Sequence, residues 1–305
     1  MSPDRAGSVR TTVDGRELTI SNLDKVLYPS TGFTKGEMIE YYARIAPVML
    51  AHVRDRPLTM KRFPDGVEGQ SFFEKHRPVH APEWMRSVSV PASQDGTHIE
   101  YCVLCDVPSV VWVANLATIE LHVPLWRVGR RRTLPAPPDH MVFDLDPGEG
   151  TTIVECCRVA SLIVEALGPE VTCLAKTSGS KGLQLYRPLD GQMGWDELRD
   201  TAHGTARRIE AEHPDLVVSN MRKSFRRGKV LIDWSQNHPV KTTIAPYSLR
   251  ARPDPTASTP VTWEEVERCA DSGDPDQLRF TAHDVLDRVE RMGDLFAPVG
   301  DGSSA

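Results

Sequence analysis

The sequence predicts a mixed fold of helices and strands, either α/β or α+β, because helix-like and strand-like segments alternate along the chain. Its 305 residues are 40% hydrophobic and 26% charged, as in an ordinary globular domain. Four threonines, Thr34, Thr152, Thr262 and Thr281, are each followed three residues later by Glu or Asp, a pair that commonly begins a helix. A chain of this length has room for one large domain or two small ones.

Each of the four threonine pairs predicts a helix start. They lie at Thr34, Thr152, Thr262 and Thr281. After the first start, apolar residues recur at helical spacing and form one face, which consists of Met38, Tyr42, Ile45 and Met49. The second helix is expected to stop near Gly168, because glycine commonly follows a last helical turn. Residues 195–212 form a further predicted helix.

Apolar runs bounded by turn residues predict the strands. A short hairpin is expected over residues 13–20, with Asp14-Gly15 at its turn. Further strands are expected over residues 99–104, 110–114, 141–146, 171–175, 183–186 and 229–234. Residues 1–10 and 298–305 are expected to be flexible, which leaves residues 11–297 as one folded domain.

Charge and hydropathy limit the classes of function. A net charge of −6 argues against a nucleic-acid partner, although residues 130–132 and 222–229 are locally basic. Such runs are either solvated surface or phosphate contacts, and both interpretations stay open. There is no membrane-length apolar stretch and no secretory signal, so a cytoplasmic protein is expected. The Cys102–Cys105 spacing lacks a second ligand pair, which favours buried thiols over a zinc site.

Two aspartates interrupt an apolar strand near its end. Asp144 and Asp146 are two residues apart, so both side chains lie on one face, roughly 6.6 Å apart along the strand. Carboxylates this close repel each other, and a divalent cation such as Mg²⁺ or Mn²⁺ removes that cost. Asp233, at the end of another apolar strand, adds the third carboxylate that a two-metal site needs. A solvated pair at a loop edge is the competing interpretation.

A loop of small residues, Ser178-Gly-Ser-Lys181-Gly182, joins two predicted strands. Backbone N–H groups can approach an anion there, the two hydroxyls can donate, and Lys181 supplies positive charge. The spacing is not that of a Walker P-loop. The sequence therefore predicts either a phosphate-binding loop or a simple hairpin loop.

Several motifs occur in a fixed order along nearly the whole chain. They are Asn22-Leu-Asp-Lys25, Thr34-Lys35, Phe72-Phe73-Glu-Lys, Glu120-Leu-His122-Val-Pro, Asp144-Leu-Asp146-Pro-Gly, Ser178-Gly-Ser-Lys181-Gly, Asp233-Trp-Ser-Gln236-Asn and Thr-Ile-Ala-Pro-Tyr-Ser-Leu-Arg250. Together, over residues 17–295, they resemble the polymerase domain of bacterial ligase D, in the archaeo-eukaryotic primase superfamily.

The resemblance implies an α+β primase-polymerase fold with an RRM-like catalytic core and a packed N-terminal α/β module. It implies a DNA-directed nucleotidyltransferase that extends primer 3′ ends and fills short gaps in bacterial DNA break or gap repair. Two ions, Mn²⁺ or else Mg²⁺, would take part, and NTP or dNTP would be the substrate, with ribonucleotides preferred.

The resemblance also implies roles for individual residues. The catalytic and metal-binding residues would be Asp144, Asp146 and Asp233. The incoming nucleotide, chiefly its triphosphate, would contact His122, Ser178, Lys181, Gln184, Arg226, Gln236 and Arg250. The DNA contacts would be Asn22, Lys25 and Lys35 at a downstream 5′-phosphate, Phe72 and Phe73 beside the template, and residues 220–229 near DNA ends.

Without the motifs, these residues have simpler interpretations. Lys25 and Lys35 would be ordinary surface lysines, His122 a satisfied core histidine, and Phe72 and Phe73 core residues. One residue departs from the resemblance. Gln184 stands where the family often has His, and glutamine can hydrogen-bond a phosphate but carries no positive charge.

Two other functions stay open, namely a two-metal nuclease or phosphatase and a non-catalytic module that binds DNA ends. The expected partners are gapped DNA, or ends with a 3′ overhang, with the 5′-phosphate recognised. A separate ATP-dependent DNA ligase and Ku are the expected protein partners. Because no ligase or nuclease segment is attached, we expect a free-standing, nucleoid-associated monomer, with a domain cut from a longer chain as the alternative.

Overall fold

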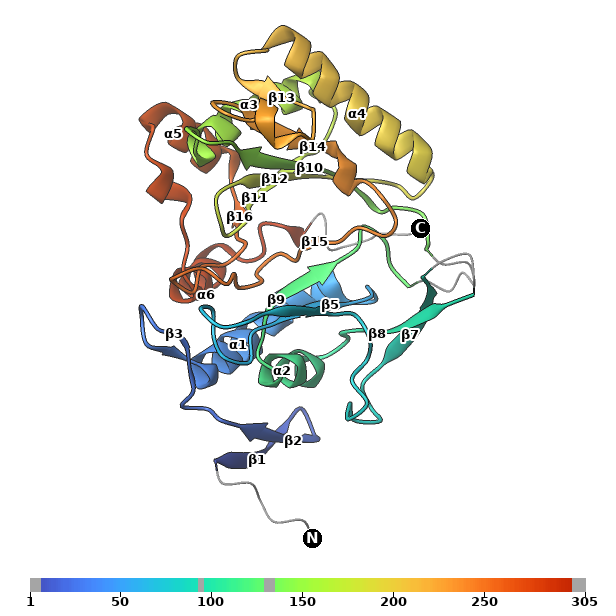
Figure 1. The fold of residues 1–305 in the computed structure, drawn as a ribbon, viewed down its shortest axis with the longest axis vertical. Helices are drawn as coiled ribbons and strands as arrows, with labels where there is room; N and C mark the ends of the chain where they lie inside the picture. Colours follow the sequence, from blue (N-terminus) through green and yellow to red (C-terminus); the bar gives the residue numbers. More distant parts are fainter. Residues whose placement is uncertain (1–6, 93–95, 129–134, 298–305) are drawn as a thin grey trace.

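Two larger sheets lie one above the other in the view of Figure 1, with helices on their outer sides. The computed structural model describes residues 7–92, 96–128 and 135–297. The upper sheet has six strands and the lower has four. Each sheet has its own hydrophobic core, so the chain divides into two packed layers.

The upper sheet has the strand order β13-β14-β10-β12-β11-β16. Its strands are β10 (His140–Pro147), β11 (Leu174–Thr177), β12 (Leu183–Pro188), β13 (Val217–Val218), β14 (Val230–Asp233) and β16 (Pro260–Val261). Helices α3 (Ile153–Leu167), α4 (Trp195–Glu212) and α5 (Trp263–Ser272) cover its outer face (Figure 1).

The chain order β10-α3-β11-β12-α4-β14 gives the upper sheet a βαββαβ core. The four strands stand in the spatial order fourth, first, third, second, and all three pairings are antiparallel. This is the arrangement of the RRM and ferredoxin-like folds. The RRM-like core that the resemblance implied is therefore confirmed.

The lower sheet has the order β15-β9-β5-β6. Its strands are β5 (Thr59–Arg62), β6 (Phe72–Glu74), β9 (Thr118–Val123) and β15 (Thr243–Ile244). The helices that share its core are α1 (Lys35–Val53), α2 (Val107–Asn115) and α6 (Ala282–Met292). Three hairpins complete the unit, β1 (Ser8–Val13) with β2 (Arg16–Ser21), β3 (Val26–Tyr28) with β4 (Phe33–Thr34), and β7 (Ser87–Pro91) with β8 (His98–Cys102).

Most local predictions are confirmed by the hydrogen bonding. All four threonines close a capping box with the acidic residue three positions on. Helix α4 has the predicted bounds, and Gly168 follows α3 with a φ of 94°. The predicted apolar face of α1 is fully buried. All six cysteines are free thiols, and burial raises the pKa of Cys102 to about 11, as expected for a buried thiol.

The strand prediction for residues 110–114 is wrong, and the one for residues 171–175 is right only for its last two residues. Residues 110–114 belong to helix α2, because the Asp106 carboxylate accepts a hydrogen bond from Ser109 N at 3.0 Å and caps the helix. This helix is buried on all sides, so its valines carry no amphipathic pattern that sequence could separate from a strand. Residues 8–10, expected to be flexible, lie in β1, and β11 begins at Leu174 rather than at residue 171.

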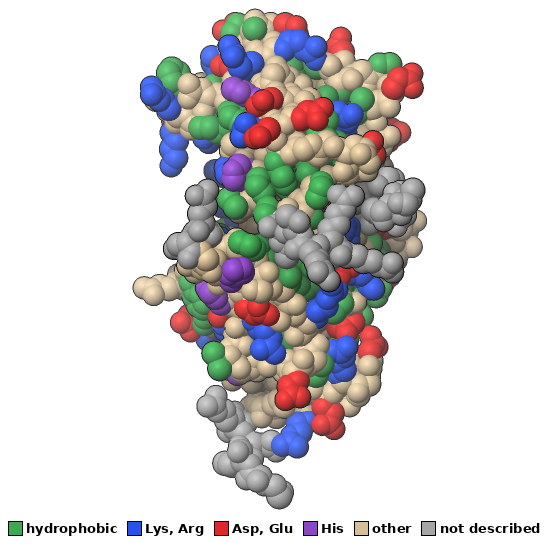
Figure 2. All heavy atoms as spheres, turned by 90° about the vertical axis from the view of Figure 1, so that its right-hand side faces the viewer, with side chains coloured by type: hydrophobic (Ala, Val, Ile, Leu, Met, Phe, Trp, Pro, Cys, Tyr) green, Lys and Arg blue, Asp and Glu red, His purple; other side chains and the backbone are tan. Residues whose placement is uncertain are grey.

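The surface is evenly mixed in charge on the face that Figure 2 shows, where acidic and basic side chains are interspersed. With a net charge of −6, binding to a polyanion would therefore depend on local basic clusters. Among the described residues, no helix is both long and apolar enough to span a membrane.

Candidate active site

Four polar side chains form a row across the upper sheet. Asp144 on β10 pairs in register with Asp233 on β14 and with Gln184 on β12. Gln184 in turn pairs with Lys176 on β11. Register partners point to the same face of a sheet, so all four side chains lie on the face turned away from α3, toward β15. Lys176 Nζ confirms this direction, because it donates to Ile244 O of β15 at 3.1 Å.

Three carboxylates share this face, as the sequence predicted. Asp146 lies two residues beyond Asp144 on β10, next to Asp233. Burial raises the pKa of Asp144, and the charges of Asp146 and Asp233 raise it further. A hydrogen bond from Gln184 opposes this shift. Burial and Asp233 likewise raise the pKa of Asp146. Such upward shifts are expected where carboxylates crowd together without a neutralising cation.

The donor chemistry of the three aspartates fits a divalent cation, since carboxylate oxygens are preferred by Mg²⁺ and Mn²⁺. As placed, no three His, Cys, Asp or Glu side chains in the described part of the chain surround one point closely enough to hold an ion. Asp233 is occupied locally, accepting hydrogen bonds from Ser235 N at 2.9 Å and from Gln236 Nε2 at 2.9 Å. Each oxygen of Asp233 thus accepts a hydrogen bond from the segment that follows β14.

Glu120 on β9 organises the basic side chains of the site, although it had no predicted role. Its carboxylate lies 3.0 Å from His122 Nε2, 3.3 Å from Arg250 Nε and 3.8 Å from Lys61 Nζ. Burial alone would raise the pKa of Glu120, but the hydrogen bond from His122 and the neighbouring positive charges lower it to about 2. Glu120 is therefore a fixed negative charge that orients three cationic or hydrogen-bonding side chains.

His122 lies on β9, an interior strand of the lower sheet, and its side chain is partly exposed rather than enclosed in the core. Its ring meets the ring of Phe73 edge to face, with centroids 5.7 Å apart. Burial lowers the pKa of His122, and the Glu120 carboxylate opposes that shift. His122 is therefore not simply a core histidine with its hydrogen bonds satisfied, because its partner Glu120 also pairs with Arg250 and Lys61.

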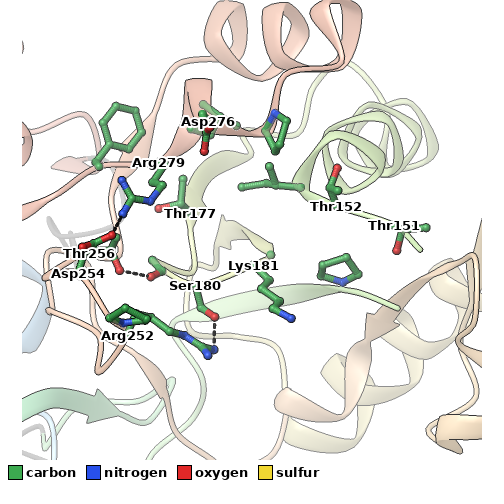
Figure 3. A pocket seen from close by; sticks show the side chains of 18 residues that line it. Thr151, Thr152, Thr177, Ser180, Lys181, Arg252, Asp254, Thr256, Asp276 and Arg279 are labelled. Carbon is green, nitrogen blue, oxygen red and sulfur yellow. Dashed lines mark hydrogen bonds and ion pairs between the residues drawn. The ribbon is translucent and has the colours of Figure 1, made fainter. Parts of the chain in front are cut away.

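The segment from Arg250 to Thr256 braces the Ser178–Gly182 loop. Arg250 donates to Ser178 O at 3.0 Å, Thr256 Oγ1 donates to Gly179 O at 2.7 Å, and Arg252 bonds to Ser180 Oγ (Figure 3). Lys181 is exposed, and no hydrogen bond or ion pair joins its side chain to the described residues. The loop is thus rigid and offers one uncommitted ammonium group, as a phosphate-binding loop requires.

A cavity of about 530 Å³ lies beside this loop (Figure 3). Lys181, Arg252, Arg279 and the N-terminal turn of α3 at Thr152 line it, and none of the three aspartates does. Arg279 pairs there with Asp254. Lys181 therefore lines a cavity to which none of the three aspartates contributes.

Gly182 is held where only glycine fits. A Cβ at this position would lie 2.1 Å from Leu145 O, the carbonyl between the two aspartates of β10. We predict that Gly182→Ala destabilises the fold by about 1–3 kcal/mol through overpacking. The matched control is Gly204→Ala in α4, where the Cβ meets nothing within 4 Å and should stabilise by about 0.5–1 kcal/mol. Urea denaturation measures both, and equal free energies of unfolding for the two variants would contradict this placement.

The basic segment of residues 220–229 is tied to the turn after Asp146. Gly228 N donates to Glu149 O at 2.8 Å, and Gly148 N donates to Lys229 O at 2.9 Å. The charge of Arg226 acts on Asp146, and Arg226 donates to Met221 O at 2.6 Å. Arg226 thus lies beside the carboxylate face.

Lys35 is buried, not the surface lysine of the simpler interpretation. Only 4% of it is exposed, and its ammonium donates to Ser21 O at 2.6 Å and to Asn115 Oδ1 at 2.8 Å. Burial lowers the pKa of Lys35 to about 8, and the charges of Lys25 and Arg62 add to the effect. Neutral acceptors therefore hold an ammonium that lacks a carboxylate partner in the described structure.

Lys25 and Asn22 lie near Lys35 at the start of α1, and the three residues form a polar cluster. Lys35 N donates to Lys25 O at 2.8 Å, so the two lysines are neighbours through the backbone. Lys25 Nζ forms an exposed ion pair with Asp65 at 2.9 Å, and Asn22 is exposed with a φ of 56°. The cluster (Asn22, Lys25 and Lys35) lies on the lower unit, apart from the three aspartates.

Phe72 and Phe73 are exposed by 45% and 58%, so neither is a core residue. Arg62 lies 5.3 Å from the ring centroid of Phe72, and Lys61 lies 5.5 Å from that of Phe73. Exposed aromatic rings beside cations are suited to stacking nucleic-acid bases. The structure thus joins Phe73 to the Glu120–His122 cluster at one border of the site.

The comparisons with known proteins agree on one family. The sequence model of the LigD primase-polymerase domain matches residues 34–296. The multifunctional non-homologous end joining DNA repair protein LigD of Mycobacterium tuberculosis (strain ATCC 25618 / H37Rv) is 42% identical over 297 residues, covering 94% of this chain and 38% of that protein. The bifunctional non-homologous end joining protein LigD of Bacillus subtilis (strain 168) is 29% identical, with 91% and 43% covered.

The fold agrees as well. A solved structure of the polymerase domain from Mycobacterium tuberculosis ligase D in complex with DNA has a TM-score of 0.86 and 41% identity, covering 93% of this chain and 98% of that one. The chain spans about two fifths of the length of the LigD relatives it matches. With the RRM-like core and the three aspartates on one face of its sheet, the chain belongs to the LigD primase-polymerase domain family, whose members are nucleotidyltransferases.

Proposed function

We propose that this chain adds nucleotides to the 3′ end of a primer strand and fills short gaps during repair of DNA breaks by end joining. One observation carries the proposal, the convergence of Asp144, Asp146 and Asp233 on one sheet face beside a braced loop that presents Lys181. A nuclease would need carboxylates but not a site for a triphosphate. The Ser178–Gly182 loop and Arg250 favour nucleotide transfer for that reason.

The three aspartates would hold two divalent ions, for which we propose Mn²⁺ or Mg²⁺. When bound, such ions supply Lewis-acid stabilisation to the attacking and leaving oxygens of a phosphoryl displacement. The chain itself supplies position and charge. Arg250, which Glu120 orients, would neutralise the triphosphate together with Lys181. The hydroxyl of Ser178 would donate a hydrogen bond to it, and His122 and Arg226 would border it. Gln236, which now bonds to Asp233, would be released when Asp233 turns to an ion.

The DNA would lie along the lower unit. Phe72 and Phe73 would stack on template bases, and the Asn22–Lys25–Lys35 cluster would bind the 5′-phosphate across a gap. The product would be a nick with a 3′-hydroxyl and a 5′-phosphate, which is the substrate of a DNA ligase. We therefore propose a DNA ligase as the next enzyme, with Ku at the same ends and the nucleoid as the location.

Gap filling tests the proposed function. We expect the chain to fill a one-nucleotide gap with a 5′-phosphate, faster with ribonucleotides than deoxyribonucleotides and faster with Mn²⁺ than Mg²⁺. The control variant Asp144→Ala should bind the same DNA without extending it. DNA binding by the wild-type chain without incorporation under any combination of metal and nucleotide would identify an end-binding module instead.

The buried Lys35 makes recognition of the 5′-phosphate depend on pH. Because the pKa of Lys35 is about 8, its ammonium loses its proton as the pH rises from 7 to 9.5, whereas the phosphate is already fully ionised. We expect the affinity ratio between 5′-phosphate and 5′-hydroxyl gaps to fall several-fold, up to about 10-fold, by pH 9. Fluorescence anisotropy at fixed salt measures this ratio. In Lys35→Met it should be low and independent of pH, and a wild-type ratio that stays constant would exclude Lys35 from phosphate binding.

A further inference from the structure

We propose that Lys176 and Gln184 act together to fix the orientation of the Asp144 carboxylate, which makes Gln184 a positioning residue rather than a nucleotide contact. This inference rests on the proposed function, since it assumes that Asp144 holds a divalent ion. It concerns residues of the row across the upper sheet, Asp233–Asp144–Gln184–Lys176.

Lys176 is a fully buried ammonium with all three of its donors in use. They go to Gln184 Oε1 at 2.5 Å, Ser258 Oγ at 2.6 Å and Ile244 O at 3.1 Å. None of these acceptors is charged, and a buried ammonium without an ion pair is costly. Burial lowers the pKa of Lys176 well below its ordinary value, and the charge of Asp144, on the far side of Gln184, opposes that shift. Lys176 therefore acts on Asp144 through the glutamine between them.

The buried lysine fixes which way the Gln184 amide points. A lysine ammonium can only donate, so Gln184 must turn its carbonyl oxygen toward Lys176. Its NH₂ group then faces Asp144, to which Gln184 hydrogen-bonds. On its other side Asp144 faces Asp233, a carboxylate that offers no donor. Gln184 thus holds one oxygen of Asp144 and leaves the other lone pairs for a ligand.

Burial argues against a direct contact between Gln184 and a nucleotide. Gln184 is 4% exposed, and both ends of its amide are used by Lys176 and Asp144. The histidine common at this place in the family also offers one acceptor and one donor when neutral. Glutamine and histidine can therefore fill the same place between a lysine and an aspartate, which explains why this chain tolerates the replacement.

The test compares three variants by two readouts. Binding of Mn²⁺ alone is measured by electron paramagnetic resonance of the free ion, and primer extension gives kcat and the KM for the nucleotide. Gln184→Met keeps the size but removes both hydrogen bonds, Gln184→His restores a donor and an acceptor, and Ser258→Ala removes a different partner of Lys176. Groups that orient a metal ligand typically contribute 10- to 100-fold to metal affinity.

We expect Gln184→Met to weaken Mn²⁺ binding about 10- to 100-fold and to lower kcat similarly, with the nucleotide KM nearly unchanged. Gln184→His should recover most of both losses, and Ser258→Ala should leave Mn²⁺ binding near the wild-type value. If Gln184→Met does not fold, the double variant Lys176→Met/Gln184→Met removes both polar groups from the core and should show the same loss of Mn²⁺ binding.

Wild-type Mn²⁺ affinity in Gln184→Met or in the double variant would overturn the inference, and so would a rise in nucleotide KM alone, which would mark a nucleotide contact. Asp144→Asn separates the inference from the proposed function. If Asp144→Asn still binds Mn²⁺ and extends primers, the proposed function fails. If it loses both while Gln184→Met keeps both, only the positioning role fails.

Discussion

Replacing Asp144 by Asn should abolish primer extension, with a loss of kcat of at least about 10³-fold, the upper end of the effect of removing one group that stabilises charge in a transition state. Asp144 is the central carboxylate of the row, flanked by Asp233 and Gln184 and followed by Asp146. Asparagine keeps the size of the side chain and still accepts a hydrogen bond from Gln184. The change thus removes the charge that an ion needs.

The fold should survive this substitution. Burial and the neighbouring carboxylates hold the pKa of Asp144 above its ordinary value, so its ionised form is unfavourable in the folded protein at neutral pH. We therefore expect Asp144→Asn to be at least as stable as the wild type in urea. The matched control is Glu149→Gln, an exposed acid in the turn after β10, which should extend primers at the wild-type rate. Normal extension by Asp144→Asn would disprove the proposed site.

Replacing Glu120 by Gln should reduce stability and nucleotide binding together. The carboxylate is 3% exposed and pairs with His122, Arg250 and Lys61. Removing one partner of a buried ion pair typically costs about 3–5 kcal/mol, because the remaining charges are left uncompensated. Since Arg250 also holds the Ser178 carbonyl, we expect the nucleotide KM to rise at least about 10-fold, the change that corresponds to about 1.4 kcal/mol of binding.

The pH dependence gives a second readout for Glu120. Its pKa is lowered to about 2, below the value of an unfolded glutamate, so its contribution to stability is present at neutral pH and is lost as the pH falls toward 2. The wild type should therefore lose more stability than Glu120→Gln between pH 5 and pH 3. Glu290→Gln is the control, because the Glu290–Arg44 pair is exposed and should contribute at most about 1 kcal/mol. If Glu120→Gln and Glu290→Gln change the free energy of unfolding equally, the proposed role of Glu120 in the site is wrong.

Much of the site was predictable because strand periodicity is simple. Two aspartates two residues apart must share a face, and the apolar run before Asp233 predicted a second strand. That β14 is the neighbour of β10 follows only from the βαββαβ connectivity, which pairs the first strand with the last. The resemblance to a known family implied that these two strands are neighbours, whereas the local pattern of apolar and polar residues did not.

Other features depend on tertiary contacts that local sequence does not encode. Glu120 gains its role from Arg250, 130 positions away in the chain, although a charged residue two positions before His122 on a strand was a usable signal. Nothing in the local sequence predicted that Lys176 is buried, because a lysine inside a strand commonly faces solvent. The burial of Lys35 depends on Asn115 at the end of α2, a helix whose valine run predicted a strand.

The most direct measurement counts the products of the wild-type reaction on a labelled primer–template with one nucleotide and Mn²⁺. The proposed chemistry requires the 3′-hydroxyl to displace pyrophosphate from the nucleotide, so one pyrophosphate should appear for each nucleotide added to the strand. Shortening of the labelled strand, or release of inorganic phosphate without strand growth, would contradict a nucleotidyltransferase built on Asp144, Asp146 and Asp233.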